Sequence, residues 1–139
     1  ASVVVADGVA PPWAAASFDR VLVDVPCSGL GALRRRRDAR WRRQPADLLT
    51  LRPLQEALLR SGIEAVRPGG LVAYATCSPH LDETGRVVEA VTRERADVDV
   101  VDVRPFLPGV DALGAGPAIQ LWPHRHGTDA MYLALLRRR

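Results

Sequence analysis

The fold expected for this chain is decided by residues 18–25, which read FDRVLVDV. Three consecutive aliphatic residues at Val21–Val23 are typical of a strand buried on both faces of a parallel sheet. Farther along, LVAYA at Leu71–Ala75 has the same character, and a helical stripe of Leu, Ile and Val over Ala46–Val66 lies between the two. Strand, helix, strand in this order predicts an α/β fold with parallel strands.

The flanking segments extend this alternating pattern in both directions. Pro, Gly and Asp residues punctuate the chain at the expected boundaries. In chain order we expect a strand at Ser2–Ala6, a short helix from Ala46 that gives way to a main helix beginning at Pro53, a helix N-capped by Asp82, a strand at Val98–Val103, an irregular stretch over 104–128, and a last strand at Ala130–Leu136.

Length and composition limit the classes of protein to consider. With 139 residues, 47% hydrophobic and 25% charged, the chain has the size and balance of one globular domain. No apolar run approaches the roughly 18 residues of a membrane span. Two cysteines are too few for a disulfide scaffold or a four-thiolate zinc site, and we expect no metal. A reducing, cytoplasmic location is the expectation that follows.

Positive charge is concentrated in one segment, Arg34–Arg43, which reads RRRRDARWRR. Its seven arginines face one aspartate, whereas the rest of the chain carries more acids than bases. A solvated loop is one interpretation of such a stretch. The other is a phosphate-binding patch with an aromatic ring that stacks on a base, and we favour it. The predicted RNA-binding residues are Arg34, Arg35, Arg36, Arg37, Arg40, Trp41, Arg42 and Arg43.

Both cysteines follow predicted strands, Cys27 after one and Cys77 after the next. Ligands of open α/β sheets bind at the carboxyl ends of strands, so the two thiols should face one cleft if the strands are neighbours. Small buried hydrophobes and a redox pair are the simpler alternatives. Two separate thiols with a nearby carboxyl group also suit thiolate addition to an electron-poor ring, such as cytosine attacked at C6 and alkylated at C5.

Three blocks of sequence carry a resemblance to a known family. They are DVPCSGLG at Asp24–Gly31, ATCSPH at Ala75–His80 and PHRHGTDAMYL at Pro123–Leu133. Together with the arginine-rich run, these blocks resemble the Sun/RsmB-type (NSUN-like) RNA 5-methylcytosine methyltransferases. The resemblance implies a Rossmann-like class I methyltransferase sheet, mostly parallel with an antiparallel last strand. It also implies S-adenosyl-L-methionine as cofactor and RNA, ribosomal or transfer, as substrate.

The same resemblance implies a role for each matching residue. Cys77 would be the nucleophile on C6 of cytosine, and Cys27 would assist loss of the C5 proton and release of the product. Asp24 would bind the base edge and contribute to the cofactor site, together with Pro26. Asp7 matches the family position that contacts the cofactor's adenine. Glu83 stands for one of the acidic residues that follow the second cysteine block.

The glycine-rich loop of the family is missing ahead of Ala1. We therefore expect residues 1–139 to be a partial, C-terminal methyltransferase domain that lacks two strands of the sheet and is inactive alone. The strand at Phe18–Val25 would then expose an apolar edge, a pairing hazard. Either a homodimer forms through this edge or Ser2–Ala6 moves onto it.

Two other functions compete with the methyltransferase interpretation. A non-catalytic RNA-binding module would keep the fold without the chemistry. A thiol enzyme would show a disulfide or a Cys–His pair, for which His80 is the nearest candidate. His124 and His126 form an H-x-H pattern, but no third metal ligand is visible near them.

Overall fold

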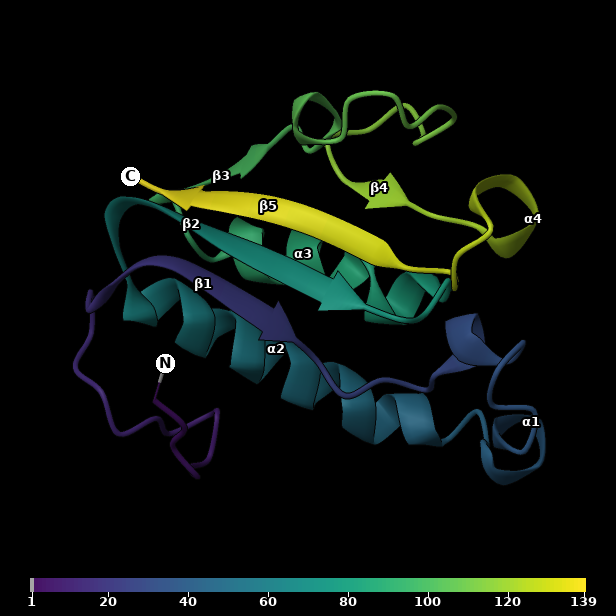
Figure 1. Cartoon of the computed structure of the whole chain (residues 1–139). Coiled ribbons are helices and arrows are strands. Elements are labelled where there is room, and N and C mark those ends of the chain that lie inside the picture. The colour runs from purple at the N-terminus through teal and green to yellow at the C-terminus, as the bar shows by residue number, and fades with distance from the viewer. Residues whose placement is uncertain (1) are drawn as a thin grey trace.

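The computed structural model describes residues 2–139, and Figure 1 shows their arrangement. A sheet carries helices on one side and a long irregular segment on the other. Short 3₁₀ turns occupy Leu30–Ala32, Leu81–Glu83 and Arg104–Phe106. The strands and helices are β1 (Phe18–Asp24), α1 (Ala39–Arg42), α2 (Asp47–Ala65), β2 (Val66–Thr76), α3 (Gly85–Arg93), β3 (Val98–Val101), β4 (Ile119–Gln120), α4 (Pro123–His126) and β5 (Tyr132–Arg138).

The sheet has the order β1-β2-β5-β3, and β4 pairs with β5. Only β1 and β2 pair in parallel, whereas β5 is antiparallel to β2, β3 and β4. The expected α/β sheet and antiparallel last strand are present, but the expectation of a mostly parallel sheet is met only in part: four strands run in one direction, yet β1–β2 is the one parallel pairing among the described residues. Because β5 lies between β2 and β3, one reversed strand separates two strands of the same direction and converts their pairings to antiparallel ones.

The hydrophobic core lies between the sheet and the helices α2 and α3, which cover the same face (Figure 1). Alternating side chains of β2 explain this: Val72 and Tyr74 are buried in the core cluster, together with Leu59 and Ile63 of α2. The strand residues that alternate with these buried ones point to the other face of the sheet. There the segment 103–121 contributes a second, smaller hydrophobic cluster. Most of the apolar burial therefore anchors β2 and β5, the two central strands.

Helix α2 differs from the expectation at Pro53. One continuous helix runs from Asp47 to Ala65 with the proline inside it, so the predicted break is absent. A proline in a helix leaves the carbonyl four residues earlier without its intrahelical partner. That residue here is Leu49 in the first turn, whose side chain is exposed, so water can reach its carbonyl. The missing bond is thus tolerated without interruption.

Helix α3 begins later than predicted. Asp82 is not its N-cap; it lies in the 3₁₀ turn Leu81–Glu83, and the helix starts at Gly85. The Asp82 carboxylate instead pairs with Arg86 at 2.8 Å and with Arg52 of α2 at 3.4 Å. Charge pairing across two helices therefore replaces the local capping contact that the sequence favoured.

The predicted strand at Ser2–Ala6 is absent. These residues belong to no strand, and the side chains of Val3 and Val5 are 94% and 100% exposed. The chain that follows packs on α2, where the Ala16 amide donates to the Glu64 carbonyl at 2.8 Å. A strand needs a neighbour to satisfy its backbone groups, and here none is within reach. The expected move onto the β1 edge is therefore wrong, and that edge carries no partner strand within residues 2–139.

Strand boundaries also shift, most of all in β2. This strand starts at Val66, five residues before the predicted start, because Gly69 adopts φ +84° and lets the Arg67–Gly70 turn rejoin the sheet. The pairing with β1 is irregular at this point. β3 ends at Val101 and β5 runs two residues beyond the predicted end. The stretches predicted as loops contain the short elements α1, α4 and β4.

None of the helices within residues 2–139 is long and apolar enough to cross a membrane.

Candidate active site at the carboxyl ends of β1 and β2

The two thiols lie together at one edge of the sheet. Asp24 pairs with Ala75 in the last rungs of the parallel ladder, so β1 and β2 end side by side. A loop follows each strand, and the Sγ atoms of Cys27 and Cys77 in these two loops are 3.3 Å apart. The prediction that the cysteines share one cleft is therefore confirmed.

The close contact makes the two cysteines titrate as a pair. The two sulfurs share a hydrogen bond that either of them can donate, and this contact lowers the pKa of Cys27 to about 6. The same contact, together with burial, raises the pKa of Cys77 well above its ordinary value. The two shifts have opposite directions, so the pair as a unit loses its first proton more readily than an isolated thiol does.

A buried carboxylate, Glu83, joins the two cysteine loops. Its side chain is 0% exposed and accepts from the Ser28 amide at 2.6 Å and from the Ser28 hydroxyl at 2.5 Å. The Ser78 hydroxyl donates to it at 2.5 Å, and the Gln55 amide nitrogen of α2 donates at 3.2 Å. Gln55 also donates to the Pro26 carbonyl at 2.9 Å. The serine that follows each cysteine therefore hydrogen-bonds to the same carboxylate, that of Glu83.

Gly31 fixes the depth at which the Cys27 loop docks. Its amide donates to the Cys77 carbonyl at 3.0 Å, and its carbonyl accepts from the Ala130 amide at 3.0 Å. A Cβ at this position would lie 2.2 Å from the Ala130 oxygen and 2.7 Å from the Cys77 oxygen. Only glycine fits between these two backbone segments.

The other predicted catalytic and cofactor residues divide into two groups. Asp24 and Pro26 are exposed at the carboxyl end of β1, beside the thiols. Asp7 belongs to the N-terminal segment, which Figure 1 shows beside α2 at the amino end of β1, away from the carboxyl ends of the strands. Its carboxylate accepts from the Val9 amide at 2.9 Å within its own turn. The structure therefore brings Asp24 and Pro26 to the thiol pair and leaves Asp7 apart from it.

Three of the predicted RNA-binding arginines have partners inside the protein. Arg34 and Arg35 both pair with Asp129, which is buried; the Arg34 contact is 2.8 Å. Arg35 and then Arg34 lower the pKa of Asp129 to about 2. Arg43 donates to the Ser28 carbonyl at 3.0 Å. These side chains hold the basic segment against the cysteine loops.

The rest of the basic segment faces outward around α1. The indole of Trp41 is 81% exposed, and with Leu33 and three arginines it lines a hollow of about 450 Å³. Arg42 has only an exposed ion pair with Asp38 at 3.5 Å. All seven arginines of the segment are exposed, and those without a contact to Asp129 or to the Ser28 carbonyl are Arg36, Arg37, Arg40 and Arg42.

His80 and His126, considered for a thiol enzyme and a metal site, form hydrogen bonds with the nearby backbone instead. Both cysteines are free in the described part of the chain, and His80 accepts the Asp82 amide at its Nδ1. His126 accepts from the Trp122 amide at 2.8 Å, and its other ring nitrogen contacts the Asp111 carbonyl at 3.0 Å. These histidines serve local backbone structure.

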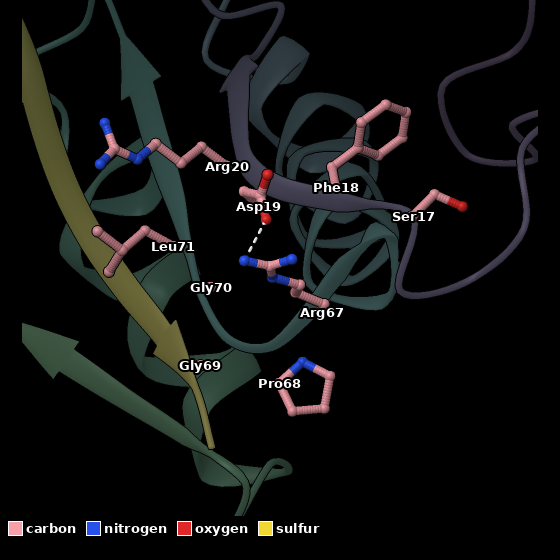
Figure 2. A pocket seen from close by; sticks show the side chains of 9 residues that line it. All are labelled: Ser17, Phe18, Asp19, Arg20, Arg67, Pro68, Gly69, Gly70 and Leu71. Atoms are coloured by element: carbon pink, nitrogen blue, oxygen red, sulfur yellow. Dashed lines mark ion pairs between the residues drawn. The ribbon is translucent and has the colours of Figure 1, made fainter.

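A large open pocket lies away from the thiols, at the amino ends of β1 and β2 (Figure 2). It has a volume of about 850 Å³ and is spanned by an ion pair between Arg67 and Asp19 at 2.5 Å. Exposed turn residues surround it, and no thiol or buried carboxylate points into it. The thiols and the buried carboxylate Glu83 lie at the opposite, carboxyl ends of these strands.

Sequence reasoning missed the roles of Gln55, Ser28 and Ser78. A signal was present for the first of these, because Gln55 falls on the apolar stripe of α2, where a polar side chain needs a buried partner. A serine directly after each cysteine was a second signal. Neither pattern names the acceptor, which comes from a separate turn and is set by the fold.

Comparisons with known proteins show the family of the chain. A family model described as 16S rRNA methyltransferase RsmB/F matches residues 1–137. A Mycobacterium tuberculosis (strain H37Rv) protein named "Putative methyltransferase Rv1407" is 63% identical over 87% of this chain and 26% of its own length. The ribosomal RNA small subunit methyltransferase B of Vibrio cholerae is 34% identical over 89% of this chain and 26% of its own length. The chain thus spans about a quarter of the length of these curated relatives.

Solved structures show the same fold. The crystal structure of PH0851 matches with a TM-score of 0.81 and 28% identity, over 89% of this chain and 27% of that one. The crystal structure of NSun6 from Pyrococcus horikoshii with SFG matches with a TM-score of 0.67 and 24% identity, over 84% of this chain and 29% of that one.

Proposed function

Because the chain belongs to the RsmB/F family of 16S rRNA methyltransferases, we propose that the protein methylates C5 of a cytosine in RNA, with S-adenosyl-L-methionine as donor. The observation that carries this proposal is the pair of thiols 3.3 Å apart beside the exposed Asp24. The substrate we favour is ribosomal RNA, with transfer RNA as the alternative. The reducing cytoplasm, where thiols persist, is the proposed location.

Cys77 acts as the nucleophile in this proposal. As its sulfur bonds to C6 of cytosine, its proton passes to the Cys27 thiolate 3.3 Å away. Asp24 binds the N3 and N4 edge of the base and stabilises the charge that develops on the ring. Cys27 then loses that proton to solvent. Once C5 is alkylated, Cys27 removes the C5 proton, and the electrons of that bond re-form C5=C6 and expel Cys77.

The residues present fit one side of a cofactor site. Asp24 and Pro26 are exposed at the carboxyl end of β1, where ligands of open α/β sheets bind. They would hold S-adenosyl-L-methionine next to the base, and when bound it supplies the methyl group. Asp7 belongs to the N-terminal segment, which Figure 1 shows at the amino end of β1, and it joins this site only if that segment takes another position.

RNA would be held by the outward-facing part of the basic segment. The arginines around α1 suit phosphates, and the exposed Trp41 suits stacking on a base. Charge reversal at Arg37 and Arg40 should weaken RNA binding and flatten its salt dependence. Charge reversal at Arg93, which is exposed on α3, is the matched control. An unchanged salt slope would leave the segment as a solvated loop.

The proposal is tested by trapping the adduct in the full-length protein. Cys27→Ala is incubated with S-adenosyl-L-methionine and cellular RNA, and denaturing gels are examined for a protein–RNA complex. We expect a complex that disappears when Cys77 is also changed. Methylation by the wild type without any complex would reverse or remove the assigned thiol roles. Neither methylation nor a complex would favour a non-catalytic RNA-binding module.

A further inference from the structure

The contacts of Glu83 set it apart from every other acid of the chain. Its carboxylate lies at the junction of the two cysteine loops, and all its side-chain partners are hydrogen-bond donors. Two donors come from Ser28, one from Ser78 and one from Gln55. An isolated carboxylate is strongly disfavoured inside a protein unless such donors surround it. The loops therefore have to close over Glu83 for the site to form.

This closure determines where the sulfurs lie. Ser28 follows Cys27 directly, and Ser78 follows Cys77 directly, so each tie acts one residue from a thiol. Both hydroxyls reach the same carboxylate oxygen, at 2.5 Å each, and are themselves 3.5 Å apart. Holding these two residues on one atom brings the preceding residues together as well.

We propose that Glu83 is a positioning residue that clamps the two cysteine loops and sets the distance between the reacting thiols. The inference rests on the proposed function for its catalytic meaning, but not for its geometry. Glu83 is completely buried and contacts neither sulfur by a hydrogen bond, so it acts through Ser28 and Ser78. Without the Glu83 carboxylate, the buried donors of Ser28, Ser78 and Gln55 lose their acceptor. Opening both loops toward water then becomes more favourable, because water can accept these hydrogen bonds.

Thiol spacing can be measured without any methyl transfer. Phenylarsine oxide reacts with two nearby thiols, forms two As–S bonds and releases one water. It therefore reports whether Cys27 and Cys77 stay within bridging distance. We would follow its capture by intact-protein mass spectrometry on the full-length protein, with folding checked by circular dichroism.

The decisive variants are Glu83→Ala and Glu83→Gln. Alanine removes all the ties, and we expect slower arsenical capture and a loss of methylation on the order of 100-fold, as for a small misplacement of reacting groups. Glutamine keeps the shape: its oxygen can accept from the Ser28 amide and Gln55, while its nitrogen donates to the two hydroxyls. We expect it to retain most of the capture rate.

Milder single substitutions keep the test usable if Glu83→Ala fails to fold. Ser28→Ala and Ser78→Ala each remove one hydroxyl tie, while the Ser28 amide still donates to Glu83, so each should slow capture less than Glu83→Ala. Tyr74→Phe is the matched control, because the Tyr74 hydroxyl donates to the Glu83 carbonyl at 2.7 Å and leaves the carboxylate ties intact. It should capture the arsenical like the wild type.

The outcomes separate this inference from the proposed function. If folded Glu83→Ala and both serine variants capture the arsenical at the wild-type rate, the clamp is wrong whatever the enzyme does. If Tyr74→Phe slows capture as much as Glu83→Ala, the effect is general loosening and the clamp is also wrong. Slower capture in Glu83→Ala alongside a wild type that never methylates RNA would keep the clamp and overturn the proposed function.

Discussion

Replacing Gly31 by alanine should open the candidate site and destabilise the protein. The added Cβ would approach the Ala130 oxygen to 2.2 Å and the Cys77 oxygen to 2.7 Å. Both atoms belong to backbone, so no side chain can rotate away to make room. The Cys27 loop would have to lift off both neighbours at once.

The cost can be worked from these contacts. Inserting a methyl group into a packed site costs about 1–3 kcal/mol. Lifting the loop also breaks the two 3.0 Å bonds from Gly31 to Cys77 and from Ala130 to Gly31, at about 1 kcal/mol each. We therefore expect Gly31→Ala to lower the free energy of unfolding by about 3–5 kcal/mol.

Urea unfolding followed by circular dichroism measures this change. Two glycines serve as controls, because a Cβ on either meets no atom within 4 Å. Gly29 has φ +73°, so Gly29→Ala should cost only the backbone penalty of about 1 kcal/mol. Gly85 begins α3, so Gly85→Ala should be neutral or stabilising. A Gly31→Ala variant within about 1 kcal/mol of wild type would refute the steric reasoning.

Further predictions concern charge and association. In Cys77→Ala the pKa of Cys27 should rise from about 6 toward its ordinary 9.0, because the hydrogen bond with Cys77 is lost. The rate of alkylation by iodoacetamide, measured against pH, gives this pKa. A midpoint that stays near 6 would contradict the pairing of the two thiols. Asp129→Asn should destabilise the protein above about pH 4, and the difference should vanish toward pH 2. The Asp129 pKa is lowered from 3.8 to about 2 by Arg35 above all, so this stability is lost as the carboxylate protonates; a pH-independent difference would count against it. Residues 1–139 alone should self-associate through the bare β1 edge, and Leu22→Lys should weaken this in sedimentation velocity; a monomeric wild-type segment would overturn the idea.

Local patterns predicted the parts of the site that depend on neighbours in sequence. The aliphatic run of β1 and the LVAYA stretch of β2 each identified a strand, and a helical crossover between parallel neighbours places both carboxyl ends on the same side of the sheet. The meeting of Cys27 and Cys77 followed from that topology alone. The start of β2 could not be foreseen, because it depends on how the turn at Gly69 meets β1.

Contacts between distant segments explain what sequence could not predict. Asp82 looked like a helix cap until α2 supplied Arg52 as a competing partner. The basic segment looked uniform, yet two of its arginines pair with the buried Asp129. Glu83 gains its partners only when three separate segments converge. Each of these outcomes is a competition between local and long-range contacts that the assembled fold decides.

The place of β5 between β2 and β3 has a consequence for how the protein is made. During synthesis β2 leaves the ribosome long before β5, with which it pairs from Leu71↔Arg137 to Thr76↔Tyr132. Until β5 emerges, β2 and β3 cannot join one sheet, and an apolar edge stays open to other chains. Assembly of this sheet is therefore a late, long-range event, and the nascent chain is most in need of protection just before its central strand arrives.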